Sequence, residues 1–164
     1  MDIDELIRTL RAVRTFTREP LTEADVEAIL DAGRRAQSSN NSQPWTFIVV
    51  RDRDTLRALS ECGRYAGHLA GATVAIALVA NEPADFDLGQ AAANMQLAAW
   101  GRGIGSCIAS MWQPDRAKAI LGVPAEQHFD AAISFGWPSP DELDRPRQKG
   151  ARRPLGEVVR NERW

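Results

Sequence analysis

Residues 87–111 read DLGQAAANMQLAAWGRGIGSCIASM, and this stretch decides the fold class. Its first part is rich in alanine and free of proline, with a wide apolar face, so it predicts a central helix over about 87–102. Glycines at alternate positions of 101–105 follow, and residues 106–111 are typical of a strand. The dinucleotide-binding fingerprint needs a strand before its glycines, whereas here a helix comes first. We therefore reject a Rossmann fold.

The glycine-rich turn also exposes a backbone that no side chain covers. Such a backbone can approach a flat ligand closely and donate amide hydrogens to it. The alternative is a helix stop followed by a tight turn, and the motif alone does not separate these two interpretations.

Helical and strand patterns alternate on both sides of this stretch. Apolar residues at helical spacing over 3–10 predict a first helix, which places Arg11 and Arg14 at or just beyond its C-terminal end. Thr22 is the predicted N-cap of a second helix that ends near Ala36.

Buried strands are predicted at 46–50, 74–80 and 129–135, where apolar and β-branched residues run together. Asp54 is expected to cap a third helix, and a short helix is expected over 115–121. These patterns do not distinguish a parallel sheet from an antiparallel one.

The length fits one domain over residues 1–164, because 164 residues at 44% hydrophobic are enough chain for one domain with its own core and too little for two. No run approaches the roughly 18 to 20 apolar residues of a membrane helix, and the first residues are acidic, so we expect a cytoplasmic protein. Cys62 and Cys107 lie far apart beside only two histidines, which indicates neither a disulfide framework nor a zinc site. Both are expected to be buried structural thiols.

The charge is unevenly distributed, although the net charge is only -2. Residues 1–144 carry 13 basic and 20 acidic side chains, whereas residues 145–164 carry seven basic and two acidic ones. The arginine-rich end favours a small phosphate or the acidic body of a partner subunit, or it is merely a solvated tail. Nucleic acid is disfavoured because the acidic body would repel a polyanion. We expect residues 138–164 to form an extended arm.

Six uncharged polar residues, SSNNSQ at 38–43, follow the second helix. Their hydroxyl and amide groups suit a neutral ligand edge with donors and acceptors, such as a flavin pyrimidine ring and ribityl chain. The alternative is an ordinary polar loop. No Ser/His/Asp or Cys/His arrangement and no paired carboxylate stands out, so an enzyme of this sequence would take its chemistry from a cofactor.

Four motifs occur along the chain: AVRTF at 12–16, QSSNNSQPW at 37–45, GIGS at 103–106 and RRPLGEVV at 152–159. In order and separation they resemble the FMN-dependent nitroreductase family over nearly the whole chain. The resemblance implies an α+β fold with a mixed, mainly antiparallel sheet flanked by helices. It also implies an obligate homodimer that exchanges its C-terminal arms and holds two FMN molecules at the subunit interface.

The resemblance further assigns cofactor contacts and no catalytic side chain, since the flavin carries the chemistry. The N-terminal arginines and one tail arginine would face the FMN phosphate or ribityl side. The polar loop would line the flavin from the partner subunit, and the glycine-rich turn would meet the ring edge through its backbone. The expected cofactor-binding residues are Arg11, Ala12, Arg14, Ser38, Ser39, Asn41, Gln43, Ile104, Gly105, Ser106 and Arg152. No metal ligand is expected.

The implied activity is NAD(P)H-dependent reduction of a nitroaromatic, quinone or activated alkene by ping-pong hydride transfer. Flavin fragmentation, dehalogenation and azoline oxidation remain open as specialised reactions of the family. A flavin-binding protein with weak or no reductase activity is the other alternative. Leu10 and Ala12 stand where the family often has arginine and serine, and Gly150 stands where a second basic tail residue often lies.

Overall fold

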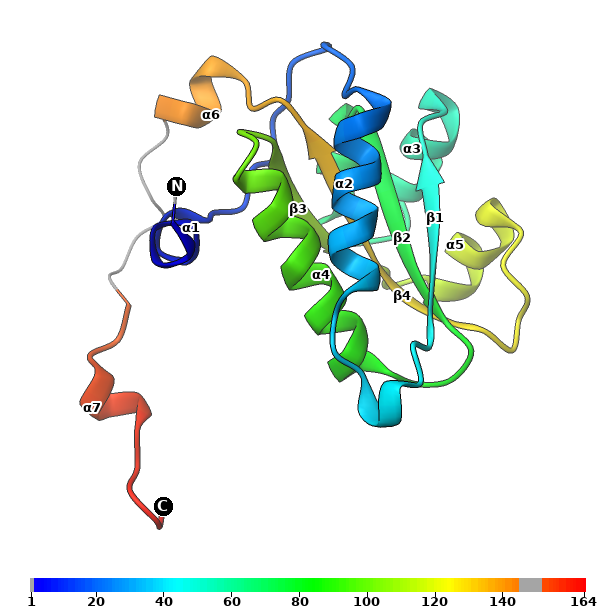
Figure 1. Cartoon of the computed structure of the whole chain (residues 1–164). Helices are drawn as coiled ribbons and strands as arrows, with labels where there is room; N and C mark the ends of the chain where they lie inside the picture. The colour runs from blue at the N-terminus through cyan, green and yellow to red at the C-terminus, as the bar shows by residue number, and fades with distance from the viewer. Residues whose placement is uncertain (1, 145–151) are drawn as a thin grey trace.

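Four antiparallel strands form the sheet at the centre of the fold, in a computed structural model that describes residues 2–144 and 152–164 (Figure 1). The strands follow the order β1-β2-β4-β3, and each neighbouring pair is antiparallel. An isolated bridge between Ala12 and Ser106 adds a parallel pairing at the β3 edge. The strands are β1 (Trp45–Val50), β2 (Val74–Ala80), β3 (Gly105–Ser110) and β4 (His128–Gly136). The expected α+β class is thus confirmed.

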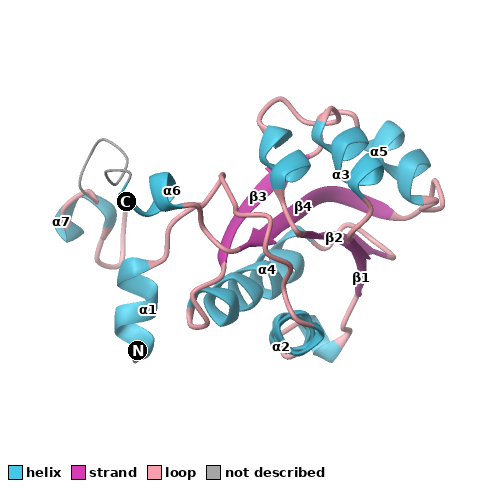
Figure 2. Ribbon diagram, turned by 90° about the horizontal axis from the view of Figure 1, so that it is seen from above, coloured by secondary structure: helices cyan, strands magenta, loops and turns pink. Residues whose placement is uncertain are grey.

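The central strand β2 is buried at each of its seven positions, because helices cover both faces of the sheet. Alternate residues of β2 belong to two separate cores, one on each face. α2 and α4 cover one face, whereas α3, η2 and α5 cover the other (Figure 1, Figure 2). These elements are α2 (Glu23–Arg34), α3 (Arg53–Ser60), η2 (Ala66–Gly71), α4 (Asp85–Trp100) and α5 (Pro114–Leu121).

The remaining elements are short helices. Figure 2 shows α1, α6 and α7 together on the side of the molecule away from α3 and α5. The short helices are α1 (Ile3–Thr9), η1 (Ser39–Asn41), α6 (Pro140–Asp144) and α7 (Leu155–Val158). None of the helices within the described residues is long and apolar enough to cross a membrane.

The quoted stretch 87–111 folds in the predicted order of helix, glycines and strand. α4 begins and ends two residues earlier than predicted, at Asp85 and Trp100. Gly103 has a φ of 78°, a left-handed conformation that glycine adopts without strain. The chain therefore turns from α4 into β3 within residues 101–104.

Helix starts follow local capping signals, with one correction. Thr22 accepts the amide of Asp25, whose carboxylate accepts the amide of Thr22, so the predicted N-cap of α2 is confirmed. The prediction that Asp54 caps the third helix is wrong. Asp52 caps α3, because its carboxylate accepts the amide three residues later. Asp54 instead lies in the first turn, where negative charge is also favoured.

The C-terminal region divides into two differently packed parts. Residues 138–144 pack on their own chain, through a bridge to Phe16 and through Glu142, which is only 4% exposed. Residues 152–164 are exposed at every position, and the hydrogen bonds described for them stay within the segment. Of the described residues after 138, only 152–164 are thus exposed throughout without packing on their own chain. Gly150 lies outside the described residues.

Candidate functional site

The segment after α1 lies along the edge of β3. Ala12 bridges to Ser106, and the amide of Val13 donates to the carbonyl of Ser106 at 2.9 Å. Val13 is fully buried against Gly105, where a Cβ would lie 2.6 Å from Cγ1 of Val13. Ala12 and Arg14, on either side of Val13, are exposed. The structure thus brings together expected site residues from two distant parts of the sequence.

The side chains of the glycine-rich turn point into the protein. Ile104 is fully buried, and Ser106 is 1% exposed. The hydroxyl of Ser106 accepts a hydrogen bond from Nε2 of Gln96 at 3.1 Å, and its carbonyl is taken by Val13. A ligand could therefore contact Ile104 and Ser106 only through their backbone.

The two N-terminal arginines have different surroundings. Arg11 donates to the carbonyls of Glu142 at 2.5 Å and Leu143 at 3.0 Å, near the C-terminal end of α6. Arg14 is exposed and makes no hydrogen bond or ion pair within residues 2–144 and 152–164. Arg152, the first residue of the described segment 152–164, is likewise exposed and makes no hydrogen bond or ion pair with the described residues. Arg14 and Arg152 therefore keep their guanidinium donors available for an anion.

A buried histidine that the sequence analysis did not single out lies behind β3. His68 of η2 is 8% exposed, and its Nδ1 lies 2.8 Å from the hydroxyl oxygen of Ser134. That hydroxyl donates to the carbonyl of Cys107 at 3.2 Å, which leaves its oxygen to accept from Nδ1 in the tautomer that carries a proton there. Nε2 of His68 is buried without a partner among the described residues.

The charge states behind β3 follow from burial. Burial lowers the pKa of His68 below its ordinary value, and the positive charge of Arg14 lowers it further. Burial raises the pKa of the Cys107 thiol, against the opposing effect of Arg14. Cys62 and Cys107 are both free and buried, as expected. His68 and Cys107, which lie behind β3, are therefore uncharged at neutral pH, and the positive charge that acts on both belongs to Arg14.

The uncharged polar loop has a constrained backbone. Its residues with left-handed φ are Asn40 (50°), Asn41 (56°) and Gln43 (49°). This conformation costs energy for residues other than glycine and persists only where the surroundings impose it. The amide of Gln43 donates to the hydroxyl of Ser38 at 3.0 Å, and the amide of Ser39 donates to Asp87 of α4 at 3.3 Å. The loop therefore presents its exposed polar groups from a fixed backbone.

The polar loop and the N-terminal arginines lie at opposite ends of α4. Ser39 is bonded to Asp87 in the first turn of α4, whereas the amide of Ile104 donates to the carbonyl of Ala99 at the other end. The helix between Asp87 and Ala99 is roughly 18 Å long at about 1.5 Å per residue. One chain therefore does not bring the loop beside Arg14 and the glycine-rich turn.

An antiparallel α+β domain with its N-terminal segment on the β3 edge defines a known class of protein. A structure from Parabacteroides distasonis, described as an NADH dehydrogenase/NAD(P)H nitroreductase homologue, superposes with a TM-score of 0.86. It is 22% identical, and the match covers 98% of this chain and 97% of that one. The fold is therefore that of the nitroreductases.

The sequence comparisons place the chain within that class. The profile of the nitroreductase family matches residues 7–82 and 60–137. A candidate NADH dehydrogenase/NAD(P)H nitroreductase of Archaeoglobus fulgidus is 36% identical over 152 residues, which cover 85% of this chain and 87% of that protein. The chain therefore belongs to the nitroreductase family.

Two further relatives bear on the chemistry. A candidate nitroreductase from Desulfovibrio desulfuricans, solved in complex with FMN, is 30% identical with a TM-score of 0.81, and the match covers 100% of this chain and 98% of that one. The 5,6-dimethylbenzimidazole synthase of Rhodospirillum rubrum is 30% identical over 172 residues, covering 83% of this chain and 82% of that protein.

Proposed function

We propose that the protein is a homodimeric FMN-dependent oxidoreductase that transfers hydride from NAD(P)H to a small electrophile, such as a nitroaromatic, a quinone or an activated alkene. Membership of the nitroreductase family supports the class of reaction. The Desulfovibrio desulfuricans relative with bound FMN supports the cofactor, and the name of the Archaeoglobus fulgidus relative supports NAD(P)H as the electron donor.

The observation that carries the proposal is the division of the expected flavin contacts between the two ends of α4. The donors of Arg14 and the backbone of the glycine-rich turn lie at one end, and the polar loop lies at the other. Neither group alone surrounds a ligand of flavin size. A second subunit that presents its polar loop to the Arg14 end would complete two equivalent sites, as a two-fold symmetric dimer requires.

The residues present fit FMN. Arg14 and Arg152 offer bidentate donors for a phosphate, and the carbonyl-bound guanidinium of Arg11 adds positive charge nearby. Ser38, Ser39, Asn41 and Gln43 would supply neutral donors and acceptors from the partner subunit. Nε2 of His68 is a buried polar atom that still lacks a partner in the described residues. Ala12 has no hydroxyl, so its contribution would be limited to its backbone.

Bound FMN would supply the redox chemistry, accepting hydride from NAD(P)H and passing it to the second substrate. The tasks left to the chain are binding and orientation. Arg14 and Arg152 would hold the phosphate, and residues 104–106 would contact the ring edge through their backbone. Burial keeps the His68 imidazole neutral, so His68 adds no charge behind β3.

Activity measurements test this proposal directly. Purified protein should be yellow and release FMN on heating or acidification, because the flavin is held by hydrogen bonds and ion pairs alone. It should oxidise NADH or NADPH in the presence of a nitroaromatic or quinone, with ping-pong kinetics. Colourless protein that takes up no added FMN would disprove it. A yellow protein without turnover would favour the flavin-binding alternative raised by Leu10 and Ala12.

A second candidate function rests on the Rhodospirillum rubrum relative. A chain of this family could fragment its flavin to 5,6-dimethylbenzimidazole instead of reducing an external acceptor. Incubation with FMN and NAD(P)H in air, followed by mass spectrometry, distinguishes the two. Dimethylbenzimidazole in the product would favour the synthase, whereas intact FMN with steady NAD(P)H oxidation and a reduced acceptor would favour the reductase.

A further inference from the structure

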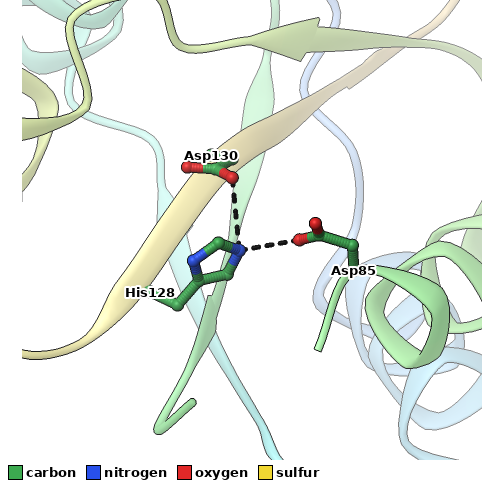
Figure 3. Close-up of side chains that lie close together, drawn as sticks. All are labelled: Asp85, His128 and Asp130. Carbon is green, nitrogen blue, oxygen red and sulfur yellow. Dashed lines mark hydrogen bonds and ion pairs between the residues drawn. The ribbon is translucent and has the colours of Figure 1, made fainter. Parts of the chain in front are cut away.

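Three side chains with metal-ligating atoms meet at the N-terminal end of α4 (Figure 3). Asp85 is the first residue of α4, and His128 and Asp130 come from the start of β4. Nε2 of His128 lies 2.7 Å from Oδ1 of Asp85 and 3.2 Å from Oδ2 of Asp130. One ligand atom from each residue lies within 4.8 Å of the other two.

We propose that Asp85, His128 and Asp130 bind a divalent transition-metal ion, with Zn²⁺ the best match. One imidazole nitrogen and two carboxylate oxygens suit Zn²⁺, which accepts mixed nitrogen and oxygen ligands and leaves further positions to water. Mg²⁺ and Ca²⁺ prefer ligand sets made of oxygen alone. This site lies outside the proposed flavin site.

The geometry of the three residues is close to that of a tetrahedral ion. Ligand atoms about 2.0 to 2.1 Å from a tetrahedral zinc lie roughly 3.3 Å from one another. The two separations from Nε2 of His128, 2.7 Å and 3.2 Å, are both shorter than that value, so the carboxylates would move slightly outward to admit an ion. A β-bulge leaves Asp130 unpaired in β4, because Leu78 pairs with Ala131 and Val79 with Phe129, and its carboxylate lies 3.2 Å from Nε2 of His128.

The three side chains differ in exposure, so one of them is held in place and the other two can move. The side chain of His128 is 20% exposed, so packing holds the ring in place, and Figure 3 shows Nε2 directed between the two carboxylates. The side chains of Asp85 and Asp130 are 78% and 55% exposed. Both carboxylates can therefore rotate toward an arriving ion and replace their contact with the imidazole.

The local charge also favours a cation. No lysine or arginine of residues 2–144 and 152–164 forms an ion pair with Asp85 or Asp130. The carboxylates of Asp85 and Asp130 both face Nε2 of His128. The positive end of the α4 dipole at Asp85 opposes this, but it amounts to about half a charge and is screened by water.

An ion at this position would have a structural consequence for the proposed flavin site. It would tie Asp85, in the first turn of α4, to the start of β4. Two residues further along α4, Asp87 accepts the amide of Ser39 in the polar loop. Metal binding would therefore stiffen the support of that loop. Only this consequence rests on the proposed function, because the binding of the metal itself does not depend on the flavin.

Calorimetric titration of Zn²⁺ into the purified protein, after dialysis against EDTA and then against a non-chelating buffer, tests the proposal. We expect one Zn²⁺ per chain and a rise in Tm when Zn²⁺ is added. His128→Ala and Asp130→Asn should each weaken binding by about tenfold or more, because the first removes a ligand atom and the second replaces a charged ligand with a neutral amide. Glu82→Gln is the matched control, since it removes an exposed negative charge three residues before Asp85 without removing a ligand.

The outcomes separate a metal site from an ordinary ion pair. An absence of Zn²⁺ binding in the unaltered protein would overturn the proposal, and so would equal binding by Asp130→Asn. Equal losses of Zn²⁺ binding in Glu82→Gln and Asp130→Asn would show that this surface attracts cations only through its overall negative charge. That result would also contradict a specific site. If His128→Ala does not fold, the Zn²⁺ affinity of Asp130→Asn decides the test. Asparagine has the shape of aspartate, and Asp130 is half exposed, so this variant should fold. Circular dichroism without metal checks that each variant is folded.

Discussion

His68 sets the electrostatic character of the layer beneath β3. Its imidazole is bonded to Ser134 at Nδ1 and has a buried Nε2 without a partner in the described residues. An orphaned buried nitrogen is costly unless something else satisfies it. A trapped water would meet that requirement. In the sequence this residue is a lone histidine among small and apolar residues, which does not distinguish it from a structural histidine.

The depressed pKa of His68 makes stability depend on pH. Because the folded-state pKa lies below the ordinary 6.5, the unfolded chain binds a proton that the folded chain refuses as the pH falls below about 6.5. Stability therefore falls on acidification in that window, at up to about 1.4 kcal/mol per pH unit, and this term vanishes above it. Urea unfolding at pH 8 and pH 5.5 should show a smaller loss for His68→Asn than for the unaltered protein. An equal loss in both would contradict the assignment.

Arg152 provides a second prediction at the level of a single residue. We expect it to bind the FMN phosphate, because a guanidinium matches phosphate oxygens in a bidentate geometry. A charge-assisted contact of this kind contributes on the order of 1.5 to 3 kcal/mol, so Arg152→Ala should weaken FMN binding roughly ten- to a hundred-fold. Riboflavin, which has no phosphate, should bind almost unchanged. Fluorescence titration of both flavins into flavin-free protein measures this, and equal losses for the two ligands would refute the role.

At the scale of elements, the contact between the N-terminal segment and β3 depends on one glycine. A Cβ at Gly105 would approach three atoms of Val13 at 2.6 to 2.9 Å. Gly105→Ala should therefore destabilise the fold by about 1 to 3 kcal/mol through overpacking, and it should loosen the segment that carries Arg14.

Gly89→Ala is the matched control for this prediction. Gly89 lies in α4, and a Cβ there would meet nothing within 4 Å. Alanine should stabilise the helix there by about 0.5 to 1 kcal/mol, so the two variants should move Tm in opposite directions in thermal denaturation. A Tm for Gly105→Ala equal to that of the unaltered protein would show that Val13 is not held as described.

Local patterns predicted most elements, and what they left open has a physical reason. The N-cap at Thr22 and the buried strand at 74–80 depend on neighbouring residues, which the sequence displays. The antiparallel order of the strands depends on pairings far along the chain, so it came from the family resemblance rather than from periodicity. The choice of Asp52 over Asp54 as helix cap reflects a difference of two residues that propensity does not resolve.

The candidate site was predictable to a similar extent. Composition identified the polar loop at 38–43 and the basic tail, because both are local features. The bridge from Ala12 to Ser106, the buried His68 and the joining of Asp85 to His128 all connect residues distant in sequence. Packing creates those contacts, and no single motif indicates them.

At the scale of the whole molecule, the exposed segment 152–164 requires an explanation. Leu155 and Trp164 are 75% and 105% exposed, which is unfavourable for large apolar side chains in water. A partner subunit that covers them would account for this exposure. We therefore expect light scattering to report a dimer for the full chain, and deletion of residues 152–164 to weaken both dimer formation and FMN binding. A stable flavin-loaded monomer would contradict the shared site.

The mixing of two defective subunits tests the shared flavin site most directly. In an Arg14→Ala chain the loop is intact, and in an Asn41→Ala chain the arginine is intact. If each site takes its arginine from one chain and its loop from the other, a heterodimer of the two variants contains one fully intact site. Heterodimers purified through two different tags should then bind about one FMN per dimer with the affinity of the unaltered protein, and should recover about half of its activity. Heterodimers that bind FMN as weakly as the two parent homodimers would show that each site is built within one chain.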